Sequence, residues 1–264
     1  MYDFAYQKPT SLADAARALT SDDEAKALAG GQTLIPVLKQ RLNKPTTVVD
    51  LGKLGLSGIT VTGDSVTIGA MTNHATVAAS ADVKRAIPAL AALAGGIGDI
   101  QVRNRGTIGG SLANNDPSAC YTSAALALAA TIITNKRSIA ADDYFQGMFT
   151  TALQPGELIT SVTFPIPAKA AYIKFKNPAS RYAMVGVFVA NGPKGVRVAV
   201  TGAGQSGVFR HTAAEAALTA KWSPAAIDGV SISPDNMNSD IHASAPYRAH
   251  LVGVITKRAV TAAG

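Results

Sequence analysis

Two glycine-rich segments constrain this chain most, because adjacent glycines interrupt a helix or a strand. "LAGGQTLIP" begins at Leu28, and "RNRGTIGGSLANNDPSAC" runs from Arg103 to Cys120. Glycine where a strand gives way to a helix lets backbone N–H groups approach an anion, and the helix N-terminus adds its dipole. The neighbouring Thr and Ser add hydroxyl donors. Two such loops suit a diphosphate, whereas each alone is equally typical of a plain turn.

Other catalytic or phosphate-binding motifs are absent. The chain has no G-x-x-x-x-G-K-[ST], and it lacks the G-x-S-x-G and H-E-x-x-H patterns. Asp142 and Asp143 are adjacent, which favours a turn or N-cap role over paired acid–base work. The histidines are scattered and are predicted to lie at the surface or at helix caps: His74, His211, His242 and His250. This shortage is typical of a protein that leaves its chemistry to a redox cofactor.

Composition narrows the class of protein further. Its 264 residues allow two domains. The formal net charge of +7 is spread along the chain, which argues against nucleic-acid binding and favours a basic surface that attracts an anionic cofactor or an acidic partner. Charged residues make up 16%, against about 25% in ordinary soluble domains. A partner subunit is therefore expected to cover part of the surface.

The single cysteine, Cys120, excludes an internal disulfide and a four-cysteine iron–sulfur or zinc site. The first residues, "MYDFAYQKPT", do not have the pattern of a signal peptide, and no apolar run approaches the length of a membrane span. We therefore expect a cytoplasmic protein with no metal site of its own.

Hydrophobic periodicity predicts the order of the elements. Ser11 is a plausible N-cap for a helix, Gly63 and Asp64 mark a hairpin, and Pro88 breaks a helical stretch. After Pro167 the pattern changes to strands followed by helices, which indicates a smaller α+β domain. Further predicted segments are a helix at 12–19, a short buried strand at 25–31, a helix at 34–42, a strand at 46–51, helices within 74–98, a buried run at 123–134 and a strand at 157–167.

Four longer motifs appear together in the chain: "AGGQTLIPVLKQRL", "DIQVRNRGTIGGSLANNDPSA", "DDYFQGMFTTALQPGELITSVTFP" and "SAPYRAHLVGVITKRAV". From about Phe4 to about Val260 the sequence resembles the FAD-binding medium subunit of molybdenum hydroxylases, the carbon monoxide dehydrogenase and xanthine dehydrogenase family. The resemblance implies an α+β fold. A two-part FAD-binding domain of the vanillyl-alcohol-oxidase (PCMH) type would occupy 1–167, divided into about 1–55 and 56–167. A C-terminal domain like that of carbon monoxide dehydrogenase flavoproteins, with a three-stranded antiparallel sheet and helices, would occupy 168–264.

The resemblance also implies where FAD lies. Many relatives carry a cofactor-contacting carboxylate where this chain has Cys120, and Asp116 could compensate or Cys120 could be an inert buried thiol. For Ile97 and Ile159 an ordinary core role is the alternative, and for Lys176 and Tyr182 a surface lysine and a strand aromatic. The implied FAD contacts are Ala29, Gly30, Gly31, Gln32, Thr33, Leu34, Ile35, Ile97, Thr107, Ile108, Gly109, Gly110, Ser111, Asp116, Cys120, Ile159, Lys176 and Tyr182.

The function implied by the resemblance is electron transfer within an oxidoreductase complex. FAD would be held non-covalently, since neither "GGQT" nor "TIGGS" contains His or Cys as an attachment point and Cys120 lies several residues beyond "TIGGS". A large subunit would hold the molybdenum cofactor and a small subunit two [2Fe–2S] clusters, in a heterotrimer or a dimer of heterotrimers. Two alternatives remain open: a free-standing flavin oxidoreductase, and a scaffold subunit that binds no cofactor.

Overall fold

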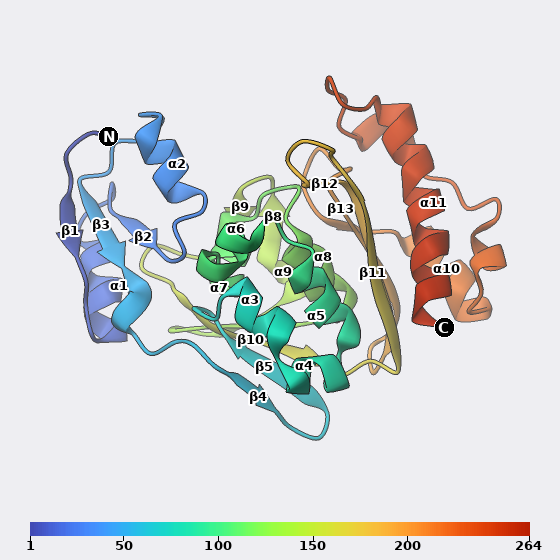
Figure 1. Ribbon diagram of the computed structural model, residues 1–264, viewed down its shortest axis with the longest axis horizontal. Coiled ribbons are helices and arrows are strands. Elements are labelled where there is room, and N and C mark those ends of the chain that lie inside the picture. The colour runs from blue at the N-terminus through green and yellow to red at the C-terminus, as the bar shows by residue number, and fades with distance from the viewer.

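The computed structural model describes residues 1–264, and its N-terminal part is a small parallel sheet flanked by helices (Figure 1). The strands lie in the order β1-β3-β2. The predicted helix after Ser11 is confirmed, and the Ser11 hydroxyl accepts the N–H of Asp14 at 3.1 Å. The bounds are β1 Ala5–Gln7, α1 Leu12–Thr20, β2 Lys26–Leu28, α2 Leu34–Lys39, β3 Thr47–Asp50 and the 3₁₀ helix η1 Leu51–Lys53.

One expectation for this part is wrong. The strand predicted to be buried at 25–31 is the short edge strand β2, in which Ala27 is exposed and Lys26 is half-buried. Side chains of a strand alternate between the two faces of the sheet, and the exposure of Ala27 shows that no packed layer covers its face. This exposure makes β2 available to line a pocket.

The middle part is an antiparallel five-stranded sheet in the order β4-β5-β10-β6-β7, covered by helices. The predicted hairpin is confirmed as β4 and β5, and the helical stretch breaks at Pro88, which begins α5. The strands are β4 Ile59–Val61, β5 Ser65–Gly69, β6 Thr131–Thr134, β7 Ser138–Ala140 and β10 Ile159–Pro165. The helices are α3 His74–Ala79, α4 Ala81–Ala86, α5 Pro88–Gly95, α6 Ile100–Arg105, α7 Ile108–Asn114, α8 Cys120–Ala127 and α9 Ala141–Tyr144.

The C-terminal sheet has four antiparallel strands in the order β11-β12-β13-β14, where the sequence predicted three. The additional strand β14 pairs Phe209 and Arg210 with the end of β13. Two residues are too few to produce a recognisable alternation, so the sequence pattern did not reveal this strand. The bounds are β11 Lys169–Lys176, β12 Ala183–Gly192, β13 Gly195–Thr201, β14 Phe209–Arg210, α10 Thr212–Ala220 and α11 Ala245–Ala263, with 3₁₀ helices η2 Pro224–Ile227 and η3 Pro234–Asn236.

The C-terminal sheet is packed on both faces. Phe188 and Ala190 of β12 and Ala199 of β13 join the core of the middle part, on the side of α5 and α8. Val187 and Val189 face the other way and pack with α10 and α11. Figure 1 shows β11, β12 and β13 between the helices of the middle part and α11. Because successive side chains of these strands point to opposite faces, the same sheet contributes residues to two separate hydrophobic cores.

A charged contact also joins the middle and C-terminal parts. The buried guanidinium of Arg197 donates to the Leu126 carbonyl at 2.7 Å and to Asp142 in α9, which is also 3.5 Å from Arg210. Asp142 therefore lies in an ion-pair network where a turn or N-cap role was predicted. Near α9, β8 Phe145–Gly147 and β9 Thr150–Thr151 form a two-stranded hairpin. No helix combines the length and apolarity needed to cross a membrane.

Candidate functional site

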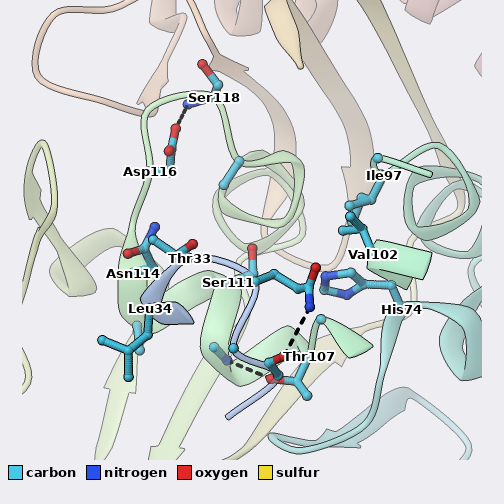
Figure 2. Close-up of a pocket in the computed structure, with 18 of the residues that line it drawn as sticks. Thr33, Leu34, His74, Ile97, Val102, Thr107, Ser111, Asn114, Asp116 and Ser118 are labelled. Atoms are coloured by element: carbon cyan, nitrogen blue, oxygen red, sulfur yellow. Dashed lines mark hydrogen bonds between the residues drawn. The ribbon is translucent and has the colours of Figure 1, made fainter. Parts of the chain in front are cut away.

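A pocket of about 510 Å³ lies where residues of all three parts meet. Figure 2 shows polar side chains from the two glycine loops on one side of it and Ile97 with Val102 on another. Its lining consists of Lys26, Ala27, Gly30, Gly31, Gln32, Thr33, Leu34, Val37, Asn43, His74, Ile97, Gly98, Val102, Gly106, Thr107, Gly110, Ser111, Ala113, Asn114, Asp116, Ser118, Ala119, Cys120, Lys174 and Tyr182.

The first glycine loop connects β2 to α2, as the sequence predicted. Gly31 has φ +75°, a conformation that glycine adopts without strain. The N–H groups of Gly31, Gln32 and Thr33 donate to no protein acceptor, and the Thr33 side chain makes no cap hydrogen bond. Three successive unpaired N–H groups at the start of a helix are suited to hold an anion.

The second glycine loop differs from the prediction, because it joins α6 to α7 and no strand precedes it. Thr107 is the N-cap of α7, and its hydroxyl accepts the Gly110 N–H at 3.1 Å. Gly110 and Ser111 lie in the first turn and line the pocket, and the Ser111 hydroxyl has no hydrogen-bond partner in the chain. This loop therefore offers the pocket a free hydroxyl and a backbone without side chains.

The two loops contact each other directly. A Cβ atom at Gly30 would lie 2.1 Å from the Arg105 carbonyl oxygen, so residue 30 must be glycine for the loops to approach. At Gly109 a Cβ would lie 2.6 Å from the Ala70 Cβ. Thus Gly30 and Gly109 serve close packing of the chain on itself, while Gly110 also faces the pocket.

The opposite wall comes from the 116–120 loop and the C-terminal sheet. Lys174 Nζ donates to the Gly96 carbonyl at 2.8 Å and lies 3.4 Å from Cys120 Sγ. The Asp116 carboxylate accepts the Ser118 N–H at 2.7 Å (Figure 2). Tyr182 is exposed at the rim, and partial burial together with the nearby Asp116 raises the pKa of its hydroxyl. A fixed ammonium, a thiol and a phenol ring therefore face the same space.

His74, predicted to be a surface or capping residue, is a buried pocket residue, with 5% of its surface exposed. Burial lowers the pKa of its imidazole to about 4, and the charge of Arg103 acts in the same direction. The imidazole is therefore neutral near pH 7. It packs at a tilt against the ring of Tyr121, with 5.3 Å between ring centroids.

Most of the residues expected to contact FAD come together at this pocket. Those in its lining are Gly30, Gly31, Gln32, Thr33, Leu34, Ile97, Thr107, Gly110, Ser111, Asp116, Cys120 and Tyr182. Those outside the lining are Ala29, Ile35, Ile108, Gly109, Ile159 and Lys176. Ile108 and Ile159 belong to the middle core, and Lys176 is exposed beyond a register shift in β11. The FAD contacts of individual residues remain predictions.

Several lining residues were not anticipated from the sequence: Lys26, His74, Val102, Asn114, Ser118 and Lys174. Lys174 lies two residues before the expected lysine on the same strand. Alternation gives both positions the same side of β11, so only the register shift between Phe175 and Lys176 separates them. His74 reaches the pocket because its N–H pairs with the Gly106 carbonyl, a long-range contact that no local pattern indicates.

The donor set fits a flavin dinucleotide. Unpaired N–H groups and hydroxyls suit an anionic diphosphate, the ammonium groups of Lys26 and Lys174 add positive charge, and Ile97, Val102 and Tyr182 offer surface to an apolar ring. No group of three or more His, Cys, Asp or Glu side chains is placed to hold a metal ion.

Comparison with known proteins agrees with this geometry. The family described as "FAD binding domain in molybdopterin dehydrogenase" matches residues 2–167. The nicotine 6-hydroxylase medium subunit of Paenarthrobacter nicotinovorans is 36% identical over 274 residues, covering 98% of this chain and 96% of that protein. The carbon monoxide dehydrogenase medium chain of Afipia carboxidovorans is 34% identical, covering 97% and 95%.

Solved structures show the same fold. The crystal structure of the Cu,Mo-CO dehydrogenase in its cyanide-inactivated form matches with a TM-score of 0.92 at 33% identity, covering 100% of this chain and 98% of that one. Quinoline 2-oxidoreductase from Pseudomonas putida 86 matches with a TM-score of 0.88 at 28% identity, covering 99% and 96%. The implied α+β fold is confirmed. The chain belongs to the family of FAD-binding medium subunits of molybdenum hydroxylases.

Proposed function

We propose that this chain binds one FAD non-covalently in the pocket and transfers electrons within a molybdenum hydroxylase complex. When bound, FAD supplies the redox chemistry, and the protein supplies position and electrostatics. The observation that carries the proposal is the row of unpaired N–H groups at Gly31, Gln32 and Thr33, which line the same pocket as Gly110 and Ser111.

Each wall has a distinct role in this proposal. The two glycine loops would hold the diphosphate through N–H groups and the Ser111 hydroxyl. The ammonium of Lys174, kept in place by the Gly96 carbonyl, provides a fixed positive charge near the cofactor. Ile97 and Val102 exclude water from one side of the pocket. Together these groups orient the cofactor without taking part in bond making.

The domain organisation follows from the same proposal. Residues 1–167 form the two-part FAD-binding domain of the vanillyl-alcohol-oxidase type, divided near residue 55, and 168–264 form the C-terminal domain. The start of β11 at Lys169 and the separate core beneath α10 and α11 support this division.

Two partner subunits complete the complex. A small subunit carries [2Fe–2S] clusters that deliver electrons to FAD, and a large subunit carries the molybdenum cofactor and chooses the substrate. FAD held in this chain would supply the link from these clusters to an external acceptor. The proposal rests on the names of the relatives, which are medium subunits or chains, on the single cysteine, and on the low charged fraction of 16%. We propose a heterotrimer or a dimer of heterotrimers.

Two other functions compete with this one. A free-standing flavin oxidoreductase needs an acid or base beside the ring, yet His74 is buried and neutral and Asp116 is engaged by the Ser118 N–H. A scaffold that binds no cofactor needs no row of unpaired donors, although Cys120 in place of a carboxylate would be compatible with it.

One experiment separates the three functions. The FAD-loaded chain is mixed anaerobically with its partner iron–sulfur subunit, reduced beforehand and freed of reductant, while flavin absorbance is followed. Rapid bleaching with the partner, and no turnover of a panel of small organic substrates by the chain alone, is the expected result. Turnover by the isolated chain would indicate the free-standing enzyme, and failure to take up FAD would indicate the scaffold.

A further inference from the structure

The imidazole of His74 is buried in the pocket wall without a hydrogen bond. Neither ring nitrogen has a hydrogen-bond partner in the chain, and Nδ1 is shielded from water. Because the ring is neutral near pH 7, one nitrogen carries a proton and the other a lone pair. Burying a polar group without a hydrogen-bond partner destabilises the folded state, so each such group in a native protein calls for a specific explanation, such as a role in binding.

The position of the ring is set by packing. His74 begins α3, and its backbone N–H donates to the Gly106 carbonyl at 3.0 Å. A Cβ at residue 106 would lie 2.6 Å from His74 Nε2, so glycine at this position makes room for the imidazole. The ring of Tyr121 covers another side. These contacts hold the imidazole next to the second glycine loop.

The environment of the two nitrogens indicates the tautomer. An N–H group buried without an acceptor is rarer in native structures than an acceptor that lacks a donor. The proton is therefore placed on Nε2, the nitrogen that is not shielded, and the lone pair on Nδ1. Figure 2 shows the His74 ring beside Val102, at the junction of the polar and apolar walls.

We propose that the Nε2–H of His74 donates a hydrogen bond to an oxygen atom of bound FAD and so positions the cofactor beside the glycine loops. This inference rests on the proposed binding of FAD in the pocket. It explains why a neutral imidazole is kept in the wall without a protein partner: the ligand supplies the missing acceptor.

Three variants of the full chain test the proposal through the Kd for FAD, measured by quenching of flavin fluorescence. Gln carries an N–H donor near the place of Nε2, Asn carries one near the place of Nδ1, and Phe keeps only the ring shape. We expect His74→Phe and His74→Asn to raise the Kd about five- to tenfold, the usual effect of losing one hydrogen bond. His74→Gln should stay within about twofold of the wild type.

The contrary results are equally clear. Wild-type affinity in His74→Phe would overturn the inference, and so would equal losses in the Asn and Gln variants, which would indicate a packing role. If His74→Phe does not fold, nitrogen NMR of histidine-labelled wild-type protein provides the answer: an Nε2–H signal that does not shift when FAD is added contradicts the proposal. Failure of the wild type itself to bind FAD would instead refute the proposed function.

Discussion

At the scale of single residues, neighbouring glycines of the pocket serve different purposes. Gly30 and Gly109 have no room for a side chain because other parts of the chain occupy the space. At Gly110 a Cβ would lie 2.9 Å from the Thr107 hydroxyl and 3.3 Å from the Ala29 Cβ, so a substitution disturbs the helix cap as well as the pocket. A useful test at Gly110 must therefore separate the steric effect from the effect of charge.

Gly110→Asp and Gly110→Asn form a matched pair with nearly the same size. Both disturb the cap, but only Asp places a negative charge beside the diphosphate, where Coulomb repulsion is weakly screened. We expect FAD binding to be abolished in Gly110→Asp and retained at reduced affinity in Gly110→Asn, with similar melting temperatures. Flavin-to-protein ratios measured beside melting curves check this. Equal FAD retention in the two variants would show that the diphosphate does not lie against this turn.

Ser111→Ala is a milder change at the same loop. The Ser111 hydroxyl has no hydrogen-bond partner within the chain, so its removal should hardly change the stability of the fold. The ligand, however, loses one hydrogen-bond donor. We expect an unchanged melting temperature without FAD and a Kd for FAD raised roughly two- to tenfold, which corresponds to about 0.5 to 1.5 kcal/mol. Titration of the apoprotein measures it, and an unchanged Kd would remove Ser111 from the site.

At the scale of elements, the C-terminal sheet fixes a wall of the pocket. The buried hydroxyl of Thr201, at the end of β13, lies 2.8 Å from the carbonyl oxygens of Pro117 and of Ala119. The Gly202 N–H donates to the same Pro117 carbonyl at 2.7 Å. Thr201 and Gly202, which are far in sequence from residues 116–120, thus hold the loop that carries Asp116 and Cys120.

Thr201→Val keeps the shape of the side chain and removes the hydroxyl. We expect the free energy of unfolding to fall by about 1 kcal/mol and FAD affinity to fall with it, because the 116–120 loop loses one of its anchors. Thr256→Val is the matched control, since Thr256 is equally buried and bonds only within α11. The control should lose similar stability in urea titrations without any change in Kd. Equal affinities in the two variants would contradict the role of Thr201.

An ion pair between the buried Glu157 carboxylate and the exposed Arg137 predicts a pH dependence. Burial alone would raise the pKa of Glu157, but hydrogen bonds from Arg137, the Gln154 N–H and Thr134 outweigh it and hold the pKa at about 2. A folded-state pKa below the ordinary value of 4.5 means that the ionised carboxylate stabilises the fold above about pH 4.5. This contribution is lost as the pH falls from about 4.5 to 2.

Glu157→Gln tests this directly. The variant should melt at a lower temperature than the wild type at pH 7, because Arg137 loses its ionic partner. The difference between the two melting temperatures should narrow as the pH falls below about 4.5, since the wild-type carboxylate is then progressively protonated. Melting curves across this range measure it, and a constant difference would contradict the assigned pKa.

At the scale of the whole molecule, local sequence patterns predicted the helices and strands better than the tertiary contacts between them. Ser11, Pro88 and the hairpin at Gly63 carry local signals, and the structure has the features they predict. His74 and Lys174 reach the pocket through contacts across many residues, which periodicity cannot encode. The exposure of β2 depends on what covers its face of the sheet, and β14 is too short to show an alternation, so neither was predicted.

The proposed function requires that this pocket hold one non-covalent FAD. That FAD is not covalently bound needs a test, because Cys120 and His74 both line the pocket. The most direct measurement is the flavin-to-protein ratio of the purified chain after incubation with FAD, followed by acid precipitation. We expect a ratio near one, with the yellow colour released into the supernatant. A chain that stays colourless would contradict FAD binding. Flavin that remains in the pellet would contradict the prediction that FAD is bound non-covalently.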